Sequence, residues 1–349
     1  MSPTDDVDLP SDWEDEDSPD PRQRRGKRLA LLGLGMAAVL VIGAGVVAAV
    51  YLNSLRTAYQ DVTTVEITRG ASDGARPETE DGTGRNILLL GSDKRSPEDA
   101  EAEGVSGQRS DVMMLVHIPE DNSAAYVTSF PRDLYVDIPG HGQGRINAAL
   151  AYGGLPLAVT TVENYTGVPI EHVALIDFDG IQGLVDTLGG IDVEVPEDFE
   201  ADGHQFTAGT QSMDGEEALA FVRARKQFSD GDFQRNRNQQ AVLAGIAEKL
   251  LSRDTLTDPG TLRETIASIA PYLTTDDALT STAMLDLGVS LRSVRSSDLY
   301  FLGAPHGDPM TTDAGASVVA TDEAAMEELR EALRTDDMGT YYAQNAGTY

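Results

Sequence analysis

The chain of 349 residues contains no cysteine, so neither a disulfide framework nor a thiolate metal site is possible. Lysine is scarce, because 4 lysines stand against 22 arginines, and no basic residue lies between Ile146 and Val222. The arginines are therefore concentrated at particular positions. A zinc-hydrolase spacing is missing as well, since no HExxH motif includes any of the five histidines, which are His117, His141, His172, His204 and His306.

Acidic residues outnumber basic residues in the chain, whose formal net charge is -32. Nucleic-acid binding requires a broad basic face for the phosphates, so we expect no nucleic-acid partner. Acidity alone also fits an ordinary soluble surface or a salt-tolerant source. The informative feature is thus where the arginines lie.

The first 52 residues have two distinct compositions. Residues 1–28 are acidic and then basic, and we expect a disordered cytoplasmic tail. Residues 29–52 are 24 uncharged residues, which as a helix rising ~1.5 Å per residue would span a bilayer. A signal peptide is the alternative, but its apolar stretch is shorter. Five basic residues precede the segment and only Arg56 closely follows it, which predicts an extracellular carboxyl-terminal part.

The remaining chain predicts a linker at 53–84, one large domain at 85–335 and a tail at 336–349. Within the domain, short apolar or β-branched runs alternate with helical patterns, which indicates an α/β fold. We expect a central mixed β-sheet covered by helices on both faces. The expected strands are 86–90, 111–118, 124–130, 172–178, 191–196 and 298–302, and the expected helices are 156–167, 179–190, 214–225, 233–252 and 322–335.

The expected helix at 233–252 has polar residues at the amino-terminal end of its apolar face. In "FQRNRNQQAVLAGIAEKLL", Val242 and Ile246 form a core-facing stripe, and the same spacing backwards reaches Gln239 and Arg235. An arginine at the buried start of a helix requires an anion, because the helix N-terminus adds positive potential there. The anion is either a ligand or a nearby carboxylate such as Asp230 or Asp232.

The preceding helical segment, "DGEEALAFVRARKQF", adds two arginines. On an ideal helix Arg223 and Arg225 point about 200° apart, but both reach one site if the helix ends before Arg225. Several arginines around one helix entrance suit a phosphate or pyrophosphate, because each planar guanidinium binds two oxygens.

Two strand ends place carboxylates beside arginines. Asp93 follows the strand in "LLLGSDKR", while Arg109 and Asp111 begin the strand in "RSDVMMLVHI". If these strands are antiparallel neighbours, Asp93 and Asp111 meet at one edge of the sheet. Two carboxylates beside phosphate oxygens suit Mg²⁺. The alternative is a pair of ordinary turn aspartates.

The stretch "VTSFPRDLYVDIPGHGQGRINAAL" displays Arg132 and Asp133 in the loop after a strand. Asp133 has three roles open to it: reaching the water shell of a metal, acting as a base, or holding Arg132, which we favour. Arg145 and Asn147 open the next helix and either line the site or cap that helix.

The series "GSDKR", "RSD", "SFPRD", "RINAA", "DF", "GGIDVEVP" and "FVRARKQFSDGDFQRNRNQQAVL" resembles, in this order, the LytR-CpsA-Psr family of cell-envelope proteins. The resemblance is strong over 85–251 and weaker to about 334. It implies a membrane-anchored phosphotransferase that moves an anionic glycopolymer from a polyprenyl-pyrophosphate carrier to peptidoglycan. It also implies Mg²⁺, with Mn²⁺ as the alternative, on Asp93 and Asp111. The implied pyrophosphate-binding residues are Arg109, Arg132, Arg223, Arg225, Arg235 and Gln239, and the catalytic group is Arg109, Arg132, Asp133, Arg223 and Arg225.

Two features depart from the family pattern: Arg145 stands where lysine is common, and acidic "SPEDAEAEGVSGQ" is inserted after "GSDKR". A lipid carrier would also need an apolar slot, which "NILLL", "VMMLV" and "ALIDF" could line between sheet and helix, although the same residues would fill the core of any α/β domain. Two other functions remain open. One is hydrolysis of a polyprenyl or nucleotide pyrophosphate, and the other is a non-catalytic anchored regulator. The polymer, whether teichoic acid, capsule or arabinogalactan, is not determined by the sequence.

Overall fold

The computed structural model describes residues 53–54, 56–67, 77, 83–92, 110–228, 231–252 and 259–348. The expected transmembrane segment, 29–52, and the tail before it lie outside these residues. Within the part described, no helix combines the length and the apolar composition that a membrane span requires. The folded unit considered below begins at Ser54.

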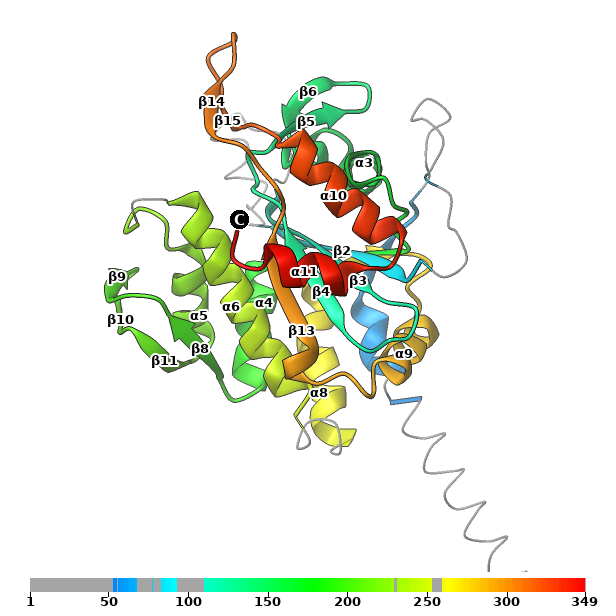
Figure 1. Cartoon of the computed structure of the whole chain (residues 1–349). Coiled ribbons are helices and arrows are strands. Elements are labelled where there is room, and N and C mark those ends of the chain that lie inside the picture. Colours follow the sequence, from blue (N-terminus) through cyan, green and yellow to red (C-terminus); the bar gives the residue numbers. More distant parts are fainter. Residues whose placement is uncertain are drawn as a thin grey trace, which may run out of the picture. The chain divides into compact units, whose positions relative to one another are not determined.

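The centre of the fold is a mixed sheet of seven strands (Figure 1). Its strands in spatial order are β1 (Thr63–Val65), β12 (Leu273–Asp276), β7 (His172–Asp177), β2 (Arg85–Ser92), β3 (Ser110–Ile118), β4 (Ala125–Ser129) and β13 (Leu299–Gly303). The pairs β1/β12, β2/β7 and β4/β13 are parallel, while β12/β7, β2/β3 and β3/β4 are antiparallel. The expected α/β fold with a mixed sheet is therefore confirmed.

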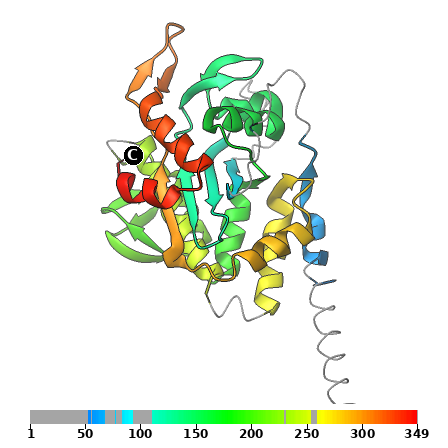
Figure 2. The ribbon, with the colours of Figure 1, turned by 45° about the vertical axis from the view of Figure 1, so that its right-hand side comes forward.

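Helices cover both faces of this sheet (Figures 1 and 2). Strand β2 is apolar at successive positions because alternate side chains enter different layers. Leu88 and Leu90 are at most 1% exposed and pack with α3 (Ala148–Thr166) and α10 (Glu323–Arg334). Leu89 faces the other layer, which contains α4 (Phe178–Thr187), α5 (Gly215–Arg223), α6 (Asp232–Leu250) and α8 (Pro259–Ile269).

Local sequence explains where the helices on the second face begin. Asp177 caps α4, since its side chain accepts a hydrogen bond from the Gly180 N–H at 2.9 Å. Asp214 and Glu217 form a reciprocal capping box at the start of α5. Four short strands lie under α5 and α6, in the pairs β8 (Ile191–Val195) with β11 (Gly209–Met213) and β9 (Phe199–Ala201) with β10 (His204–Phe206).

Two hairpins adjoin the loop after β4 (Figure 1). The first pairs β5 (Tyr135–Ile138) with β6 (Gly142–Arg145) and leads into α3. The second pairs β14 (Pro309–Thr311) with β15 (Ser317–Val319), and the Val319 N–H donates to the Asp133 carbonyl oxygen at 2.9 Å. The remaining elements are the 3₁₀ helices η1 (Tyr59–Asp61), η2 (Ala270–Tyr272) and η3 (Ser296–Asp298), and the helices α9 (Ser281–Ser290) and α11 (Met338–Asn345).

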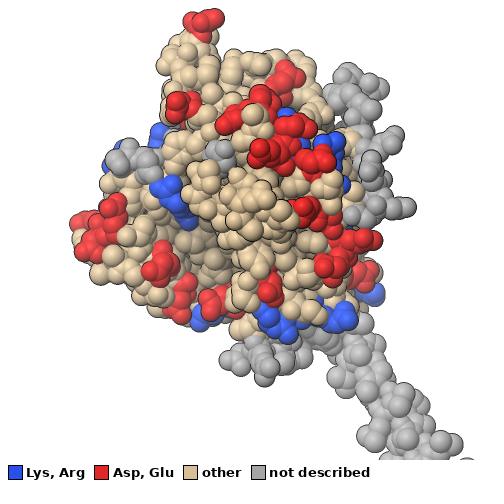
Figure 3. All heavy atoms as spheres, viewed as in Figure 1, with Lys and Arg blue, Asp and Glu red and all other residues tan. Residues whose placement is uncertain are grey.

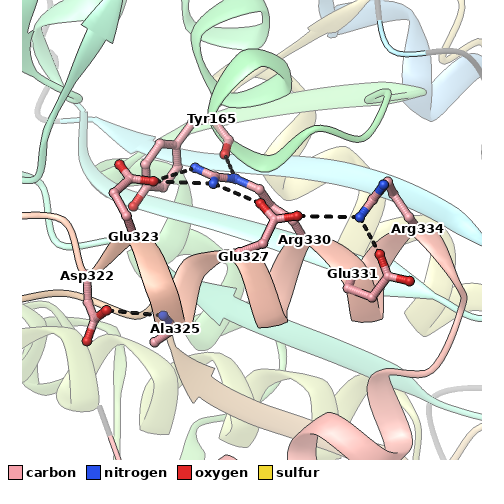
Figure 4. A network of polar contacts seen from close by, with 8 residues as sticks. All are labelled: Tyr165, Asp322, Glu323, Ala325, Glu327, Arg330, Glu331 and Arg334. Atoms are coloured by element: carbon pink, nitrogen blue, oxygen red, sulfur yellow. Dashed lines mark hydrogen bonds and ion pairs between the residues drawn. The ribbon is translucent and has the colours of Figure 1, made fainter.

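Arg330 connects α10 to the end of α3 through contacts with Tyr165 (Figure 4). Its Nε donates to the Tyr165 carbonyl oxygen at 2.8 Å, and its guanidinium lies 5.6 Å from the centre of the Tyr165 ring. Glu323 and Glu327 each lie 3.3 Å from Nη1. Burial raises the pKa of Tyr165 to about 12, so this ring stays uncharged within the helical layer.

Ordered elements also occur in the segments expected to be a linker and a tail. Strand β1, within 53–84, lengthens the sheet by pairing with β12. Helix α11, within 336–349, buries Met338 and Tyr341 against the core that contains α3 and α10. Pairing with an exposed sheet edge and burial of two large side chains explain why these short segments are structured.

Candidate active site

Several strand ends meet at one edge of the sheet. Ser92, the last residue of β2, pairs with Ser110 of antiparallel β3 and with Asp177 of parallel β7. The condition set by the sequence, that the first two strands of the domain are antiparallel neighbours, is thus met. Asp93 and Arg109 lie outside the described residues, so their predicted roles in metal and pyrophosphate binding remain predictions.

Arg132 enters this edge from the loop after β4. Its Nη1 donates to Asp111 Oδ1 at 2.7 Å, and its Nε lies 3.7 Å from Asp133 Oδ2. The Asp133 Oδ1 atom in turn lies 3.3 Å from Nε of Arg145. The shorter of these two carboxylate contacts of Arg132 is therefore with Asp111, whereas Asp133 lies between two guanidinium groups and orients both.

Helix α6 contributes the buried polar pair expected from its pattern. Arg235 and Gln239 are each 6% exposed and lie on the same face as buried Val242 and Ile246. Gln239 Nε2 donates to the Asp111 carbonyl oxygen at 3.4 Å, which connects the start of α6 to the start of β3. The predicted stripe is confirmed. Asp230 and the Asp232 side chain, the expected alternative partners of Arg235, lie outside the described residues.

The arginines after α5 follow the end of that helix. Helix α5 ends at Arg223, and Ala224 leaves the helical conformation with ψ 123°. Arg223 lies over the Phe178 ring, with 4.9 Å from its Cζ atom to the ring centre. Arg225 packs beside Gly231, which immediately precedes α6. The end of the helix between the two arginines is the condition under which both can serve one site.

Arg145 and Asn147, which the sequence placed together as possible site lining, make contacts with different parts of the protein. Arg145 donates from Nε and Nη2 to the Ser317 carbonyl oxygen, at 3.0 and 2.7 Å, so it ties the β5–β6 hairpin to the β14–β15 hairpin. Asn147 is 6% exposed, and its N–H donates to the Arg132 carbonyl oxygen at 3.2 Å. Its side chain makes no capping bond to α3. Both residues support the backbone of the Arg132 loop.

Sequence reasoning gave no role to Asp177 and Ser92, which the register places beside each other. Asp177 is 7% exposed and ends β7 where α4 begins. The available signal was its place at the carboxyl end of a strand, where α/β proteins bind ligands. Ser92 is fully buried, and its Oγ forms no hydrogen bond with any described residue.

An apolar cavity of about 210 Å³ lies directly beneath these polar residues, between the sheet and α6. Its walls come from β2, β3, β7, α4, α5 and α6, and include Leu89, Gly91, Val112, Met114, Ala174, Ile176, Phe178, Val222, Gln239, Val242 and Ile246. Of the two alternatives that the apolar strand sequences left open, a slot or ordinary core packing, residues of all three strands line a cavity. Four lining residues directly adjoin polar ones in sequence: Gly91 with Ser92, Val112 with Asp111, Phe178 with Asp177, and Val222 with Arg223. The cavity therefore begins where the polar site ends.

The residues at the sheet edge can be compared with the needs of Mg²⁺. The described residues include no group of three or more His, Cys, Asp or Glu side chains that could hold a metal ion. Asp111 Oδ1 accepts a hydrogen bond from Arg132. Ser92 Oγ, which has no hydrogen-bond partner among the described residues, lies on the neighbouring strand β2. Carboxylate and hydroxyl oxygens are hard donors, and Mg²⁺ commonly takes only one or two carboxylates plus water and substrate oxygens. The described residues thus supply one carboxylate and one hydroxyl, which are donors of the kind that Mg²⁺ takes.

Charge on the visible surface follows the composition of the chain (Figure 3). Acidic side chains are dense over α10, whereas basic side chains form a few separate groups. The site differs from this surface in its arginines: Arg223 ends α5, Arg225 lies beside the start of α6, and Arg235 is buried in the first turn of α6. Arg132 lies in the loop after β4 and contacts Asp111, whose carbonyl oxygen accepts from Gln239 of α6. A small anionic group is attracted there although the whole protein is strongly negative.

Comparisons with known proteins point to one family. The LytR_cpsA_psr family profile matches residues 51–335. The polyisoprenyl-teichoic acid–peptidoglycan teichoic acid transferase TagU of Bacillus cereus is 31% identical over 312 residues, covering 88% of this chain and 97% of that protein. TagU of Enterococcus faecalis is 37% identical over 192 residues, covering 55% of this chain and 61% of that protein.

Solved structures share the fold. TagV of B. subtilis has a TM-score of 0.61 and 28% identity, covering 74% of this chain and 99% of TagV. TagT bound to LI-WTA has a TM-score of 0.60 and 28% identity, covering 79% of this chain and 99% of TagT. The LytR-Csp2A-Psr enzyme from Actinomyces oris, at 22% identity and a TM-score of 0.60, covers 77% of this chain and 95% of its own and shows the same fold.

Proposed function

The chain belongs to the LytR-CpsA-Psr family, and we propose that it transfers an anionic cell-wall glycopolymer from a polyprenyl-pyrophosphate carrier to peptidoglycan. The product is a phosphodiester bond between polymer and glycan. One observation carries the proposal: the arginine-rich edge of the sheet continues directly into the apolar cavity. A ligand that fits both parts has an anionic head and a long apolar tail, as a polyprenyl pyrophosphate has.

Each part of the carrier has a place in this arrangement. Arg109, Arg132, Arg223, Arg225 and Arg235, together with Gln239, bind the pyrophosphate oxygens. The first isoprene units enter the cavity beneath Gln239, between Leu89 and Val242. Asp111 and Asp133 hold Arg132 from two sides, so its planar guanidinium is oriented before the substrate arrives. The names of the related transferases favour teichoic acid as the polymer.

The reaction is an in-line displacement at the phosphorus that carries the polymer. A sugar hydroxyl of peptidoglycan attacks this phosphorus and forms the new P–O bond, while the bond to the bridging oxygen breaks. The hydroxyl proton is taken up by the departing polyprenyl phosphate or by water, so atoms and charge balance. The arginines stabilise the negative charge on the departing phosphate, which is the main contribution of a protein to phosphoryl transfer. Asp93 and Asp111 would hold Mg²⁺, which would supply Lewis-acid stabilisation of the phosphate charge when bound.

The remaining organisation follows from this role. Residues 29–52 anchor the protein as a single transmembrane helix with its amino terminus in the cytoplasm. The domain at 85–335 then lies outside the cell, where peptidoglycan is assembled. The anchor keeps the site close to a carrier that is itself confined to the bilayer.

A reconstituted assay tests the proposal. Full-length protein in detergent micelles receives a radiolabelled polymer on a polyprenyl-pyrophosphate carrier, with and without purified peptidoglycan. The expected result is peptidoglycan-linked label and an equal amount of released polyprenyl phosphate. Arg132→Ala should abolish both, while Arg292→Ala, an exposed arginine on another surface, should preserve both.

The outcomes separate the competing functions. Release of lipid phosphate that does not depend on peptidoglycan would make the protein a pyrophosphatase. Carrier binding without any release, even with Mg²⁺ or Mn²⁺ present, would make it a non-catalytic binding protein. Either result would overturn the transferase proposal.

A further inference from the structure

An exposed aromatic pair lies outside the site described so far. The rings of His141 and Tyr152 are stacked, with 4.7 Å between their centres and 20° between their planes. Tyr152 is 57% exposed, the highest value for a large apolar side chain other than Val289 among the described residues. His141 is also exposed. The stack therefore contributes little to the core and presents a flat surface to solvent.

Two glycine-dependent backbone features hold this pair in position. His141 occupies the turn of the β5–β6 hairpin between Gly140 and Gly142, whose φ angles are 76° and 71°. Helix α3 is interrupted immediately after Tyr152, where Gly153 and Gly154 leave the helical conformation. Gly153 has no room for a side chain, because a Cβ atom would lie 2.5 Å from the Leu157 Cβ.

The pair is connected to the candidate active site by the hairpin itself. At the base of the hairpin, Arg145 pairs with Tyr135, and the Asn147 N–H donates to the Arg132 carbonyl oxygen. The last pair of the hairpin, Ile138 with Gly142, is three residues, or roughly 10 Å, from the pair of Tyr135 with Arg145. His141 lies in the turn just beyond this last pair. A ligand that reaches from the stack to Arg132 must be an extended molecule.

The position of the stack relative to the cavity indicates which substrate it meets. The cavity lies on the α6 face of the sheet, whereas Tyr152 belongs to α3 on the opposite face. The lipid phosphate leaves towards the cavity, so the attacking hydroxyl must approach from the opposite side of the phosphorus. The β5–β6 hairpin and α3 pack on the face of the sheet opposite the cavity. In the proposed reaction, the chain that carries the hydroxyl would therefore come past the aromatic pair.

The chemistry of the pair fits a sugar. A stacked aromatic surface offers polarisable contact area to the C–H face of a pyranose ring, and exposed Gln143 adjoins it for hydrogen bonds. We propose that His141 and Tyr152 form a binding platform for the sugar rings of the acceptor glycan strand of peptidoglycan. This inference rests on the proposed transferase function, because the acceptor is defined by that reaction.

The experiment measures acceptor binding without the donor. Fluorescent glycan strands, freed from their stem peptides by an amidase, are titrated with full-length protein in detergent micelles, and anisotropy gives Kd. Tyr152→Ala and His141→Ala should each raise Kd by about 3- to 10-fold, the effect of one lost stacking contact. Tyr152→Phe should restore binding because the ring, not the hydroxyl, makes the contact. Tyr272→Ala, an exposed tyrosine elsewhere, is the matched control.

A second measurement distinguishes acceptor from donor. In the transfer assay, Tyr152→Ala should raise KM for glycan strands while kcat at saturating acceptor and the binding of the polyprenyl-pyrophosphate carrier stay unchanged. Thermal unfolding verifies that each variant folds, and His141→Ala provides an independent test because His141 lies in an exposed turn.

The failure of this inference can be told apart from failure of the proposed function. An unchanged Kd and KM for Tyr152→Ala, beside a wild-type protein that transfers polymer, would overturn the platform alone. Weaker carrier binding in Tyr152→Ala would assign the platform to the donor and also overturn it. A wild-type protein that binds strands through Tyr152 but transfers nothing would leave the platform and remove the transferase.

Discussion

Arg132, in the loop after β4, and Asp111, at the start of β3, are joined by a 2.7 Å hydrogen bond between Nη1 and Oδ1. The side chains are 22% and 27% exposed, so the pair is open to a ligand while still partly shielded from water. The bond fixes the plane of the guanidinium and leaves further N–H groups that point in other directions. This preorganisation makes Arg132 the most informative position for mutation.

Arg132→Lys tests whether planar, bidentate binding matters. Lysine keeps the positive charge but offers a point charge instead of a fork, so we expect transfer to fall by roughly 10²-fold. The rate of polymer transfer at saturating carrier is the measurement. Retention of the wild-type rate would show that charge alone suffices and would remove Arg132 from the pyrophosphate site.

Asp111→Asn tests the metal assignment separately. The asparagine Oδ1 still accepts from Arg132, so the geometry of the pair is preserved while the ligand charge is lost. We expect the Mg²⁺ concentration for half-maximal transfer to rise markedly, because one of two carboxylates is gone. Asp137→Asn, an exposed position on β5, serves as the control. An identical Mg²⁺ titration curve for Asp111→Asn and the wild type would exclude Asp111 as a ligand.

Arg235→Gln and Arg237→Gln compare two arginines on one helix. Arg235 is 6% exposed and faces the same side as Gln239, whereas Arg237 is exposed and contacts Gln234 on its own helix. Only Arg235→Gln should weaken binding of the pyrophosphate carrier, by at least about tenfold, since a charged hydrogen bond contributes about 1.5–3 kcal/mol. Equal losses in both variants would indicate a general charge effect. Isothermal titration with the carrier is the measurement.

Much of the site was predictable because its residues sit at positions that local rules define. The 3.6-residue period of α6 placed Arg235 and Gln239 on the buried face, and both side chains are almost fully buried in the structure. The antiparallel pairing of β2 with β3 was only a condition in the sequence, although strands that are consecutive in a chain often pair. The end of α5 at Arg223 was only a condition in the sequence, since helix ends depend on tertiary packing as well as propensity.

Long-range contacts were not predictable in the same way. Asp133 adjoins Arg132 in sequence, yet Asp111 makes the closer contact, because the register of β3 against β4 decides which carboxylate reaches the guanidinium. Arg145 looked like site lining but reaches Ser317, which is 172 residues away. Strand β1 and helix α11 carry weak local signals and owe their structure to the edge and core that they contact.

Ala174→Phe fills the apolar cavity without removing any existing contact. Ala174 lies on β7 in the wall of the cavity of about 210 Å³, so the added ring enters existing space and should cost less than the ~1–3 kcal/mol of overpacking a filled core. We expect the variant to lose binding of a long polyprenyl carrier but to keep binding of a pyrophosphate with a single isoprene unit. Ala174→Val, a smaller change, should have an intermediate effect. Unchanged binding of the long carrier would place the lipid chain elsewhere, and equal loss for both ligands would show that the ring disturbs the pyrophosphate site instead.

Asp276, at the end of β12, links the pH dependence of stability to the pairing of β12 with β7. Burial alone would raise the pKa of its carboxyl group, but hydrogen bonds with His172 Nδ1, at 3.1 Å, and from the Val173 and Leu279 N–H groups outweigh burial and lower it. The ionised carboxylate therefore stabilises the folded state at neutral pH. This contribution is complete above the pKa of an unfolded aspartate, about 4, and is lost as pH falls through the lower folded value.

Urea unfolding between pH 7 and pH 3 measures the effect. At pH 7, Asp276→Asn should be less stable than the wild type by about 2 kcal/mol, because an amide cannot accept all three hydrogen bonds. Below pH 4 the wild type should lose this advantage and the two curves should converge. Asp286→Asn, on the exposed side of α9, should follow the wild type at every pH. A constant gap between Asp276→Asn and the wild type down to pH 3 would show that the hydrogen bonds do not depend on ionisation of this carboxyl group.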